Sequence, residues 1–102
     1  MKIDTEDSAP VIRIAVEGDI DLYSSPDLRK AVLKAVPRSA EGVAVDLSGV
    51  TYMDSSGVAT LVEGLRSAKE HGRSFVLDSP SAAVMKVLEL ARLESVFEVT
   101  TA

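Results

Sequence analysis

Hydrophobic residues alternate with other residues in a way that predicts β-strands. Within residues 11–16, apolar side chains occupy every second position while Arg13 points the other way, which is typical of a strand with one buried face. Residues 43–47 are nearly all apolar and predict a strand covered on both faces at the centre of a sheet. We expect three further strands, the first of them a short edge strand, at residues 1–5, 74–77 and 96–99.

Three amphipathic helices are predicted from apolar residues that return every three or four positions. The apolar stripes indicate helices over residues 26–36, 56–71 and 80–91. A Ser-Pro pair precedes the first and third helices, and this is a typical helix start because proline fits the first helical position. We expect the first helix to end at Pro37 and the second near Gly72.

The order of these elements predicts the fold class. Strands that alternate with helices of about ten or more residues are typical of right-handed crossovers and a largely parallel sheet. The length of 102 residues is that of one compact domain. We therefore predict a single α/β domain over residues 1–102. Its mixed, mostly parallel sheet is expected to have four to five strands, with an antiparallel pair at the N-terminus and three to four helices.

Composition and charge argue against several classes of partner. The net charge of −5 opposes binding to nucleic-acid phosphates, and the basic residues are scattered along the chain. No apolar stretch approaches the roughly 20 residues that a membrane span requires, so we expect no direct membrane insertion. Cysteine is absent, and residues 1–10 lack the basic and apolar segments of a secretory signal. These features predict a cytoplasmic protein.

The sequence offers little support for catalysis. His71 is the only histidine, and without a second histidine or a cysteine it is not expected to build a metal cluster. There is no Gly-x-Ser-x-Gly elbow for a serine nucleophile and no phosphate-binding loop of the Gly-x-x-x-x-Gly-Lys type. We predict that the chain is not an enzyme, has no catalytic residues, metal or cofactor, and depends on a partner for any nucleotide.

The segment 46–58 is the most informative part of the chain about function. It reads Asp-Leu-Ser-Gly-Val-Thr-Tyr-Met-Asp-Ser-Ser-Gly-Val and leads from a buried strand through a polar loop into a helix. Ser55 stands at the predicted start of that helix, where its hydroxyl is either a cap for free backbone amides or a phosphoacceptor. The local pattern favours the cap, since short motifs often occur by chance. A phosphoacceptor is also compatible with this position, because the helix dipole tolerates an anion at a helix start.

Two segments resemble the STAS domains shared by sulfate transporters and anti-sigma factor antagonists. Residues 18–26, Gly-Asp-Ile-Asp-Leu-Tyr-Ser-Ser-Pro, are similar to the family's Gly-Glu-hydrophobic-Asp segment with its Ser/Pro helix start. Residues 50–57, Val-Thr-Tyr-Met-Asp-Ser-Ser-Gly, are similar to its phosphorylation loop. The resemblance implies a STAS-type fold, with Ser55 as the phosphoacceptor. It also implies a partner-binding surface, for which we expect Asp21, Tyr23, Ser24, Asp54, Ser56 and Gly57.

The resemblance implies a function as well. Members of the family bind an anti-sigma factor that is also an ATP-dependent serine kinase, and by doing so they free the sigma factor. Phosphorylation ends this binding, and a metal-dependent phosphoserine phosphatase restores it. We therefore expect an anti-sigma factor antagonist that is switched off by phosphorylation of Ser55. Asp21 is expected to act in recognition or phosphate transfer rather than in holding the fold.

One position departs from the better known antagonists and leaves an alternative open. Those proteins tend to read Ser-Gly-Leu-Gly after the acceptor, whereas this chain reads Ser-Gly-Val-Ala and has Ala59 in place of the second glycine. The alanine version also resembles the cytoplasmic STAS subunits of bacterial lipid-transport ABC systems. In this alternative the same surface docks constitutively on the transporter's ATPase.

Overall fold

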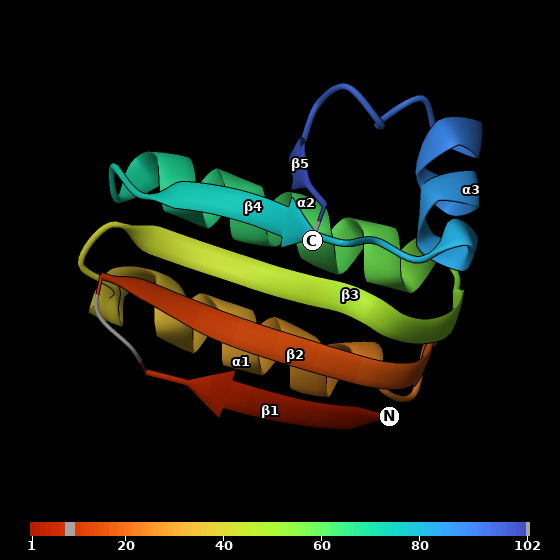
Figure 1. The fold of residues 1–102 in the computed structure, drawn as a ribbon, viewed down its shortest axis with the longest axis horizontal. Helices are drawn as coiled ribbons and strands as arrows, with labels where there is room; N and C mark the ends of the chain where they lie inside the picture. The colour runs from red at the N-terminus through yellow and green to blue at the C-terminus, as the bar shows by residue number, and fades with distance from the viewer. Residues whose placement is uncertain (8–9, 102) are drawn as a thin grey trace.

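The computed structural model describes residues 1–7 and 10–101, which form a sheet and helices in one α/β domain (Figure 1). The elements are β1 (Lys2–Glu6), β2 (Val11–Ile20), α1 (Ser25–Arg38), β3 (Gly42–Met53), α2 (Ser55–Glu70), β4 (Ser74–Asp78), α3 (Ala82–Leu90) and β5 (Glu98–Thr100). The strands are ordered β1-β2-β3-β4-β5 across the sheet. Only the β1–β2 pair within these residues is antiparallel. The predicted fold class, a mixed and mostly parallel sheet, is therefore confirmed.

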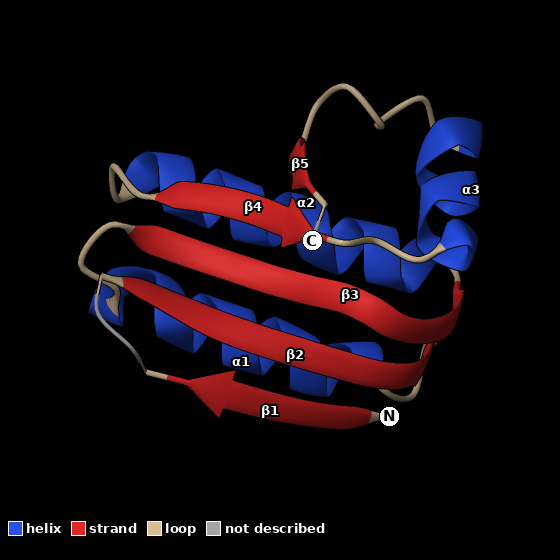
Figure 2. Ribbon diagram, in the orientation of Figure 1, coloured by secondary structure: helices blue, strands red, loops and turns tan. Residues whose placement is uncertain are grey.

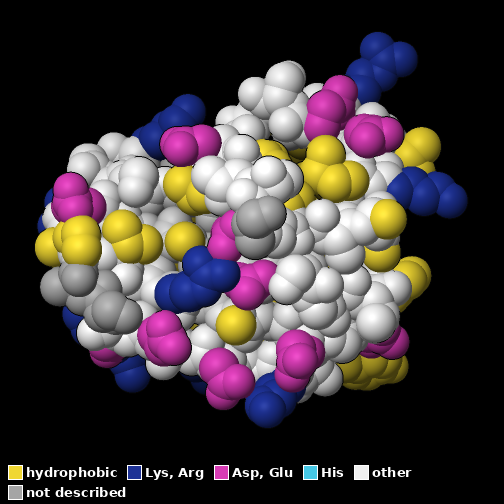
Figure 3. All heavy atoms as spheres, in the orientation of Figure 1, with side chains coloured by type: hydrophobic (Ala, Val, Ile, Leu, Met, Phe, Trp, Pro, Cys, Tyr) yellow, Lys and Arg dark blue, Asp and Glu magenta, His cyan; other side chains and the backbone are white. Residues whose placement is uncertain are grey.

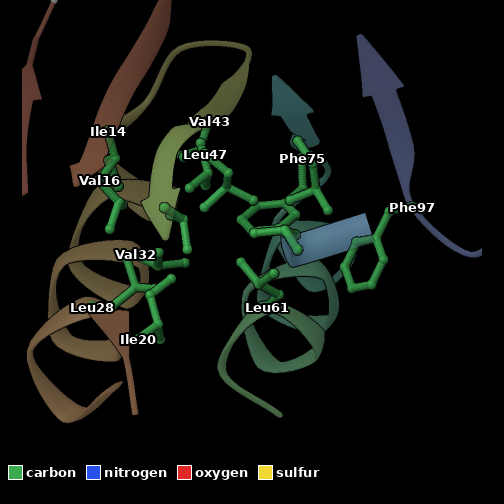
Figure 4. Close-up of a cluster of buried hydrophobic side chains, with 14 of the residues drawn as sticks. Ile14, Val16, Ile20, Leu28, Val32, Val43, Leu47, Leu61, Phe75 and Phe97 are labelled. Carbon is green, nitrogen blue, oxygen red and sulfur yellow. The ribbon is translucent and has the colours of Figure 1, made fainter. Parts of the chain in front are cut away.

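Helices α1 and α2 cover one face of the sheet, and the core lies between these helices and the sheet (Figure 2). In Figure 4, Ile14 and Val16 of β2 point toward α1, while Leu61 of α2 points toward Phe75 of β4. Burial of each such side chain contributes roughly 1.5–3 kcal/mol to folding. α3 packs against β3 at one end of the sheet. None of the helices within the described residues has the length and hydropathy needed to cross a membrane.

β2 and β3 are longer than the sequence pattern predicts, and their extra residues position the candidate site. The pattern predicts strands over residues 11–16 and 43–47, whereas β2 continues to Ile20 and β3 to Met53. The two extensions pair in parallel with shifts in register, and Gly18 has a φ of +94° at one of them. The polar residues of these extensions indicated a loop, but ladder hydrogen bonds satisfy their backbone groups.

β3 is the central strand, as predicted, but it is not covered on both faces. Val43 and Leu47 are buried toward the helices. Ala44 and Asp46 lie on the opposite, open face and are only half-buried. The prediction of two covered faces was wrong because Ala44, although apolar, is small and lies on the open face. Asp46 is held on the same face by a hydrogen bond from Arg13 and not by a covering helix.

Some element ends also differ from the prediction. Pro37 is expected to end α1, but it lies in the last turn of that helix, which ends at Arg38. Proline lacks the N–H that would bond the carbonyl four residues back, and only one more residue, Arg38, is helical after it. α3 begins at Ala82 rather than Pro80, because the Ser81 side chain provides the N-terminal cap. β5 begins two residues later than predicted.

The open face of the sheet carries a network of charged and polar side chains. Arg13 on β2 donates to Asp46 on β3 at 3.1 Å and to Asp78 on β4 at 2.5 Å. The Thr100 hydroxyl on β5 donates to Asp78 at 3.1 Å. Figure 3 views this face and shows acidic and basic side chains intermixed, with hydrophobic side chains in separate patches. The network thus joins four neighbouring strands without a second helical layer.

Candidate functional site

Two loops lie side by side at the carboxyl ends of β2 and β3. We define the first loop as residues 21–24, between β2 and α1, and the second loop as residues 54–57, at the start of α2. Ile20 pairs with Met53 at the end of the two strands, and the Asp54 N–H donates to the Ile20 carbonyl at 3.1 Å. Adjacent parallel strands end at the same edge of a sheet, so this pairing brings all the residues of the predicted surface into one region.

Asp54 is the N-terminal cap of α2. Its Oδ1 accepts the Ser56 N–H at 2.9 Å and the Ser56 hydroxyl at 2.5 Å, while its carbonyl accepts the Gly57 N–H at 3.1 Å. The bond from the Ser56 hydroxyl, followed by those from backbone amides, holds the pKa of the Asp54 carboxyl below its usual range. The first turn of α2 is therefore capped by an ionised aspartate and not by Ser55.

Ser55 is exposed at the first position of α2. Its hydroxyl makes no hydrogen bond with any of the residues that the structure describes. The neighbouring Ser56 is half-buried, and its hydroxyl is engaged by Asp54. The sequence left open whether Ser55 is a cap or a phosphoacceptor, and in the structure the N-terminal cap of α2 is Asp54. The Ser55 hydroxyl is thus exposed to solvent and has no hydrogen-bond partner among the described residues.

Asp21 shapes the first loop through its side chain. Its Oδ1 accepts the N–H groups of Tyr23 and Ser24, each at 3.0 Å, and lies 3.1 Å from the Ser24 hydroxyl. The Ser24 oxygen in turn accepts the Asp21 N–H at 2.9 Å. The Ser24 N–H is the main cause that holds the pKa of Asp21 below its usual range. This Asx turn gives the loop a defined conformation, which the sequence did not predict.

Large apolar side chains are exposed around the two loops. Tyr23 is 91% exposed and Leu22 is 71% exposed in the first loop. Tyr52, which pairs with Asp19 near the end of β3, is 51% exposed. Sequence reasoning identified Tyr23 and missed Leu22 and Tyr52. The one signal in the sequence was Leu22, an apolar residue inside an otherwise polar connection.

Gly57 lies where α2 packs most closely against the ends of the strands. A Cβ atom at this position would lie 2.5 Å from Met53 Cγ and 2.9 Å from Ile20 Cγ2. Gly57 is buried, although the sequence-based prediction placed it in the partner-binding surface. Its place in the structure is beneath that surface, where it permits the close approach that presents Ser55 at the helix start.

The site is negatively charged. Residues 19–24 and 54–57 include Asp19, Asp21 and Asp54 and contain no Lys, Arg or His. The Asp19 carboxylate accepts the Thr51 hydroxyl at 2.6 Å. Across residues 1–7 and 10–101, no group of three or more His, Asp and Glu side chains is arranged to hold a metal ion. A phosphate added to Ser55 would therefore meet the helix start and the carboxylates of Asp21 and Asp54, but no cationic side chain of these segments.

Comparison with known proteins shows the class to which this fold and site belong. A family model described as "Mlab, STAS domain" matches residues 1–99. The anti-sigma-B factor antagonist of Listeria monocytogenes is 31% identical over 90 residues, which cover 86% of this chain and 77% of that protein. The chain therefore belongs to the STAS domain family, as its two motif segments predicted. The anti-sigma-B factor antagonist of Bacillus subtilis is 28% identical over 102 residues, 98% of this chain and 91% of that protein.

Solved structures of anti-sigma factor antagonists have the same fold. One from Mycobacterium paratuberculosis superposes with a TM-score of 0.85 at 24% identity and covers 97% of this chain and 84% of its own. SpoIIAA in its unphosphorylated form gives a TM-score of 0.83 at 21% identity, covering 99% and 88%. The phosphorylated form of SpoIIAA, the Bacillus cell fate determinant, gives 0.78 at 19% identity, covering 99% and 91%. The predicted STAS-type fold is confirmed.

Proposed function

We propose that this chain is an anti-sigma factor antagonist controlled by phosphorylation of Ser55. In its unmodified form it binds an anti-sigma factor serine kinase in the cytoplasm and thereby releases the sigma factor. The observation that carries this proposal is the exposed Ser55 hydroxyl, which has no hydrogen bond within the described residues and lies among exposed apolar side chains. Such a position suits a kinase substrate that is also a docking surface.

The surroundings of Ser55 support an effect on binding rather than on folding. A phosphate adds about −1.5 to −2 charges, and the dipole at the start of a helix stabilises an anion. The neighbouring carboxylates of Asp21 and Asp54 offer the phosphate no neutralisation. A partner that covers this surface would have to desolvate an unpaired anion, which is costly. Phosphorylation is therefore expected to end binding while the domain stays folded.

The two loops supply the proposed contact surface. Around the acceptor, the contacting residues are Asp21, Tyr23, Ser24, Asp54 and Ser56, with Gly57 in support beneath them. None of these residues has a catalytic role in the proposal. The kinase supplies ATP, and a phosphoserine phosphatase returns the chain to its binding form.

The second candidate is a constitutive STAS subunit that docks on the ATPase of an ABC transporter. The observation that favours it is Ala59, which is exposed in the first turns of α2. A methyl group there lies where the better known antagonists tend to have glycine. This candidate uses the same surface but needs no phosphorylation of Ser55.

Phosphorylation by a purified kinase distinguishes the two candidates. The unmodified chain is incubated with Mg-ATP and each anti-sigma factor serine kinase encoded in the same genome, and phosphate is mapped by mass spectrometry. We expect one kinase to modify Ser55, with Ser55→Ala resistant and Ser56→Ala still modified. Calorimetric titration with that kinase should give an affinity roughly a hundredfold lower for the phosphorylated chain, since an unpaired buried charge costs about 3 kcal/mol.

Two controls complete this test. Circular dichroism is expected to show that both forms are folded, so that loss of binding is not loss of structure. Equal affinity of the unmodified and phosphorylated chains for the kinase would remove the switch and favour the transporter subunit.

A further inference from the structure

The first loop presents two adjacent apolar side chains to solvent. Leu22 and Tyr23, which we call the apolar tip, are 71% and 91% exposed. Neither side chain contributes to the buried core. Large exposed apolar side chains cost solubility and are common at protein–protein contacts, where tyrosine is among the residues that most often dominate the binding energy.

The conformation of the tip is fixed by the residues on either side of it. Asp21 Oδ1 accepts the N–H groups of Tyr23 and Ser24, and the Asp21 carbonyl accepts the Ser25 N–H at 2.8 Å. The Ser24 hydroxyl donates to the Asp19 carbonyl at 2.9 Å, which ties the loop to the end of β2. A loop that is already ordered loses less conformational entropy when a partner binds.

The tip is also continuous with the second loop. The Asp54 N–H donates to the carbonyl of Ile20, two residues before Leu22. The backbone N–H of Leu22 is one of the groups that lower the pKa of the Asp54 carboxyl, so it lies close to that side chain. Since Ser55 follows Asp54 directly, a partner that covers the Ser55 hydroxyl reaches the tip as well.

We propose that the apolar tip is the main anchor for the anti-sigma factor kinase and that Asp21 is its positioning residue. This inference rests on the proposed function and names the chemistry of the partner: an apolar recess that receives Tyr23 and Leu22 beside the site that reads Ser55. Asp21 acts through the hydrogen bonds of its Oδ1 atom and not through its charge. Asparagine has the same acceptor atom, whereas alanine has none.

The test is a titration of the anti-sigma factor kinases encoded in the same genome with five variants and the wild type. Tyr23→Ala is expected to weaken binding roughly thirtyfold and Leu22→Ala about tenfold, as for central apolar anchors. Asp21→Ala should weaken it about as much as Tyr23→Ala, while Asp21→Asn stays within about threefold of the wild type. Leu90→Ala is the matched control, because Leu90 is 77% exposed on α3 and outside both loops.

Amide hydrogen exchange separates positioning from a general loss of structure. In Asp21→Ala, exchange at Tyr23 and Ser24 should become faster while the core strands keep wild-type protection. In Asp21→Asn, exchange at both amides should stay slow. Equal losses of affinity in the two Asp21 variants would overturn positioning and assign the effect to charge.

The outcomes distinguish the tip from the switch. Binding of Tyr23→Ala and Leu22→Ala within about twofold of the wild type overturns the anchor, even where phosphorylation of Ser55 still ends binding. Tip-dependent binding that phosphorylation does not change retains the anchor and overturns the switch. If the wild-type chain binds none of these kinases, the proposed function and the tip both fail.

Discussion

Ser55 and Ser56 are adjacent in the chain, yet their hydroxyl groups are in opposite situations. Ser56 is the second residue of α2, where the Asp54 carboxylate reaches both its N–H and its hydroxyl. Ser55 is the first residue, its side chain is exposed, and no described group accepts from or donates to its hydroxyl. The difference follows from helix geometry, because a cap side chain bonds the second or third amide of the helix and leaves the first residue aside.

This arrangement predicts unequal effects of two neighbouring substitutions on stability. Ser55→Ala should leave the free energy of unfolding within about 0.5 kcal/mol of the wild type, since no hydrogen bond is lost. Asp54→Ala should lower the urea midpoint, because two hydrogen bonds to the side chain disappear. Asp54→Asn retains the acceptor oxygen and should keep most of the stability. A larger loss in Ser55→Ala than in Asp54→Ala would contradict the assignment of the cap.

At the scale of an element, the apolar stripe of α2 contains positions of unequal burial. The stripe predicts that Leu61 and Leu65 are both buried against the sheet. Leu61 is fully buried, but Leu65 is only half-buried. Gly64, between them, is buried and closely packed, since a Cβ there would lie 2.7 Å from both Phe75 and Val32. The periodicity identified the inward face correctly but not the point of closest packing along it.

Leu61→Ala is expected to lower the free energy of unfolding by about 2–5 kcal/mol, because it leaves a cavity in a closely packed core. Leu65→Ala should cost clearly less, since part of its side chain is already in contact with water. Urea denaturation of the two variants, with equal slopes as the check for two-state unfolding, measures both values. A loss at Leu61 no greater than that at Leu65 would show that the core centre is misplaced.

At the scale of the whole molecule, one network of charges joins the strands of the open face. The hydrogen bond from Arg13 is the main cause that holds the pKa of Asp78 below its usual range. For Asp46, partial burial acts to raise the pKa, but hydrogen bonds from Ser48 and Arg13 outweigh it and the pKa is also lowered. The folded chain therefore stabilises the ionised form of both carboxyl groups relative to the neutral form.

These pKa shifts predict a loss of stability in acid. A carboxyl whose pKa is lower in the folded than in the unfolded chain takes up a proton on unfolding, so stability rises with pH in the range where it titrates. The contribution is complete above about pH 5 and declines below about pH 4, through the lowered pKa values of the folded state. Urea unfolding measured across this range should show the decline, and it should be shallower in Asp78→Asn. An unchanged slope in that variant would mean that Asp78 does not contribute.

The sequence by itself determined the class of fold, the order of strands and helices along the chain, and the two segments that form the candidate site. Hydrophobic periodicity follows directly from which side of a strand or helix faces the core, so the sequence alone is enough to recognise it. The motif around Ser55 and the one that contains Asp21 were also identified from residue order alone.

Only the tertiary structure decided how these segments work together. The polar extensions of β2 and β3 became strands because they pair with each other, and such pairing joins residues about 30 positions apart. The capping of α2 by Asp54, the free hydroxyl of Ser55 and the exposure of Leu22 likewise depend on neighbours distant in the sequence or on the exact start of the helix. Periodicity records which face is buried, whereas hydrogen-bond partners and exposure are set by the groups that long-range packing brings together.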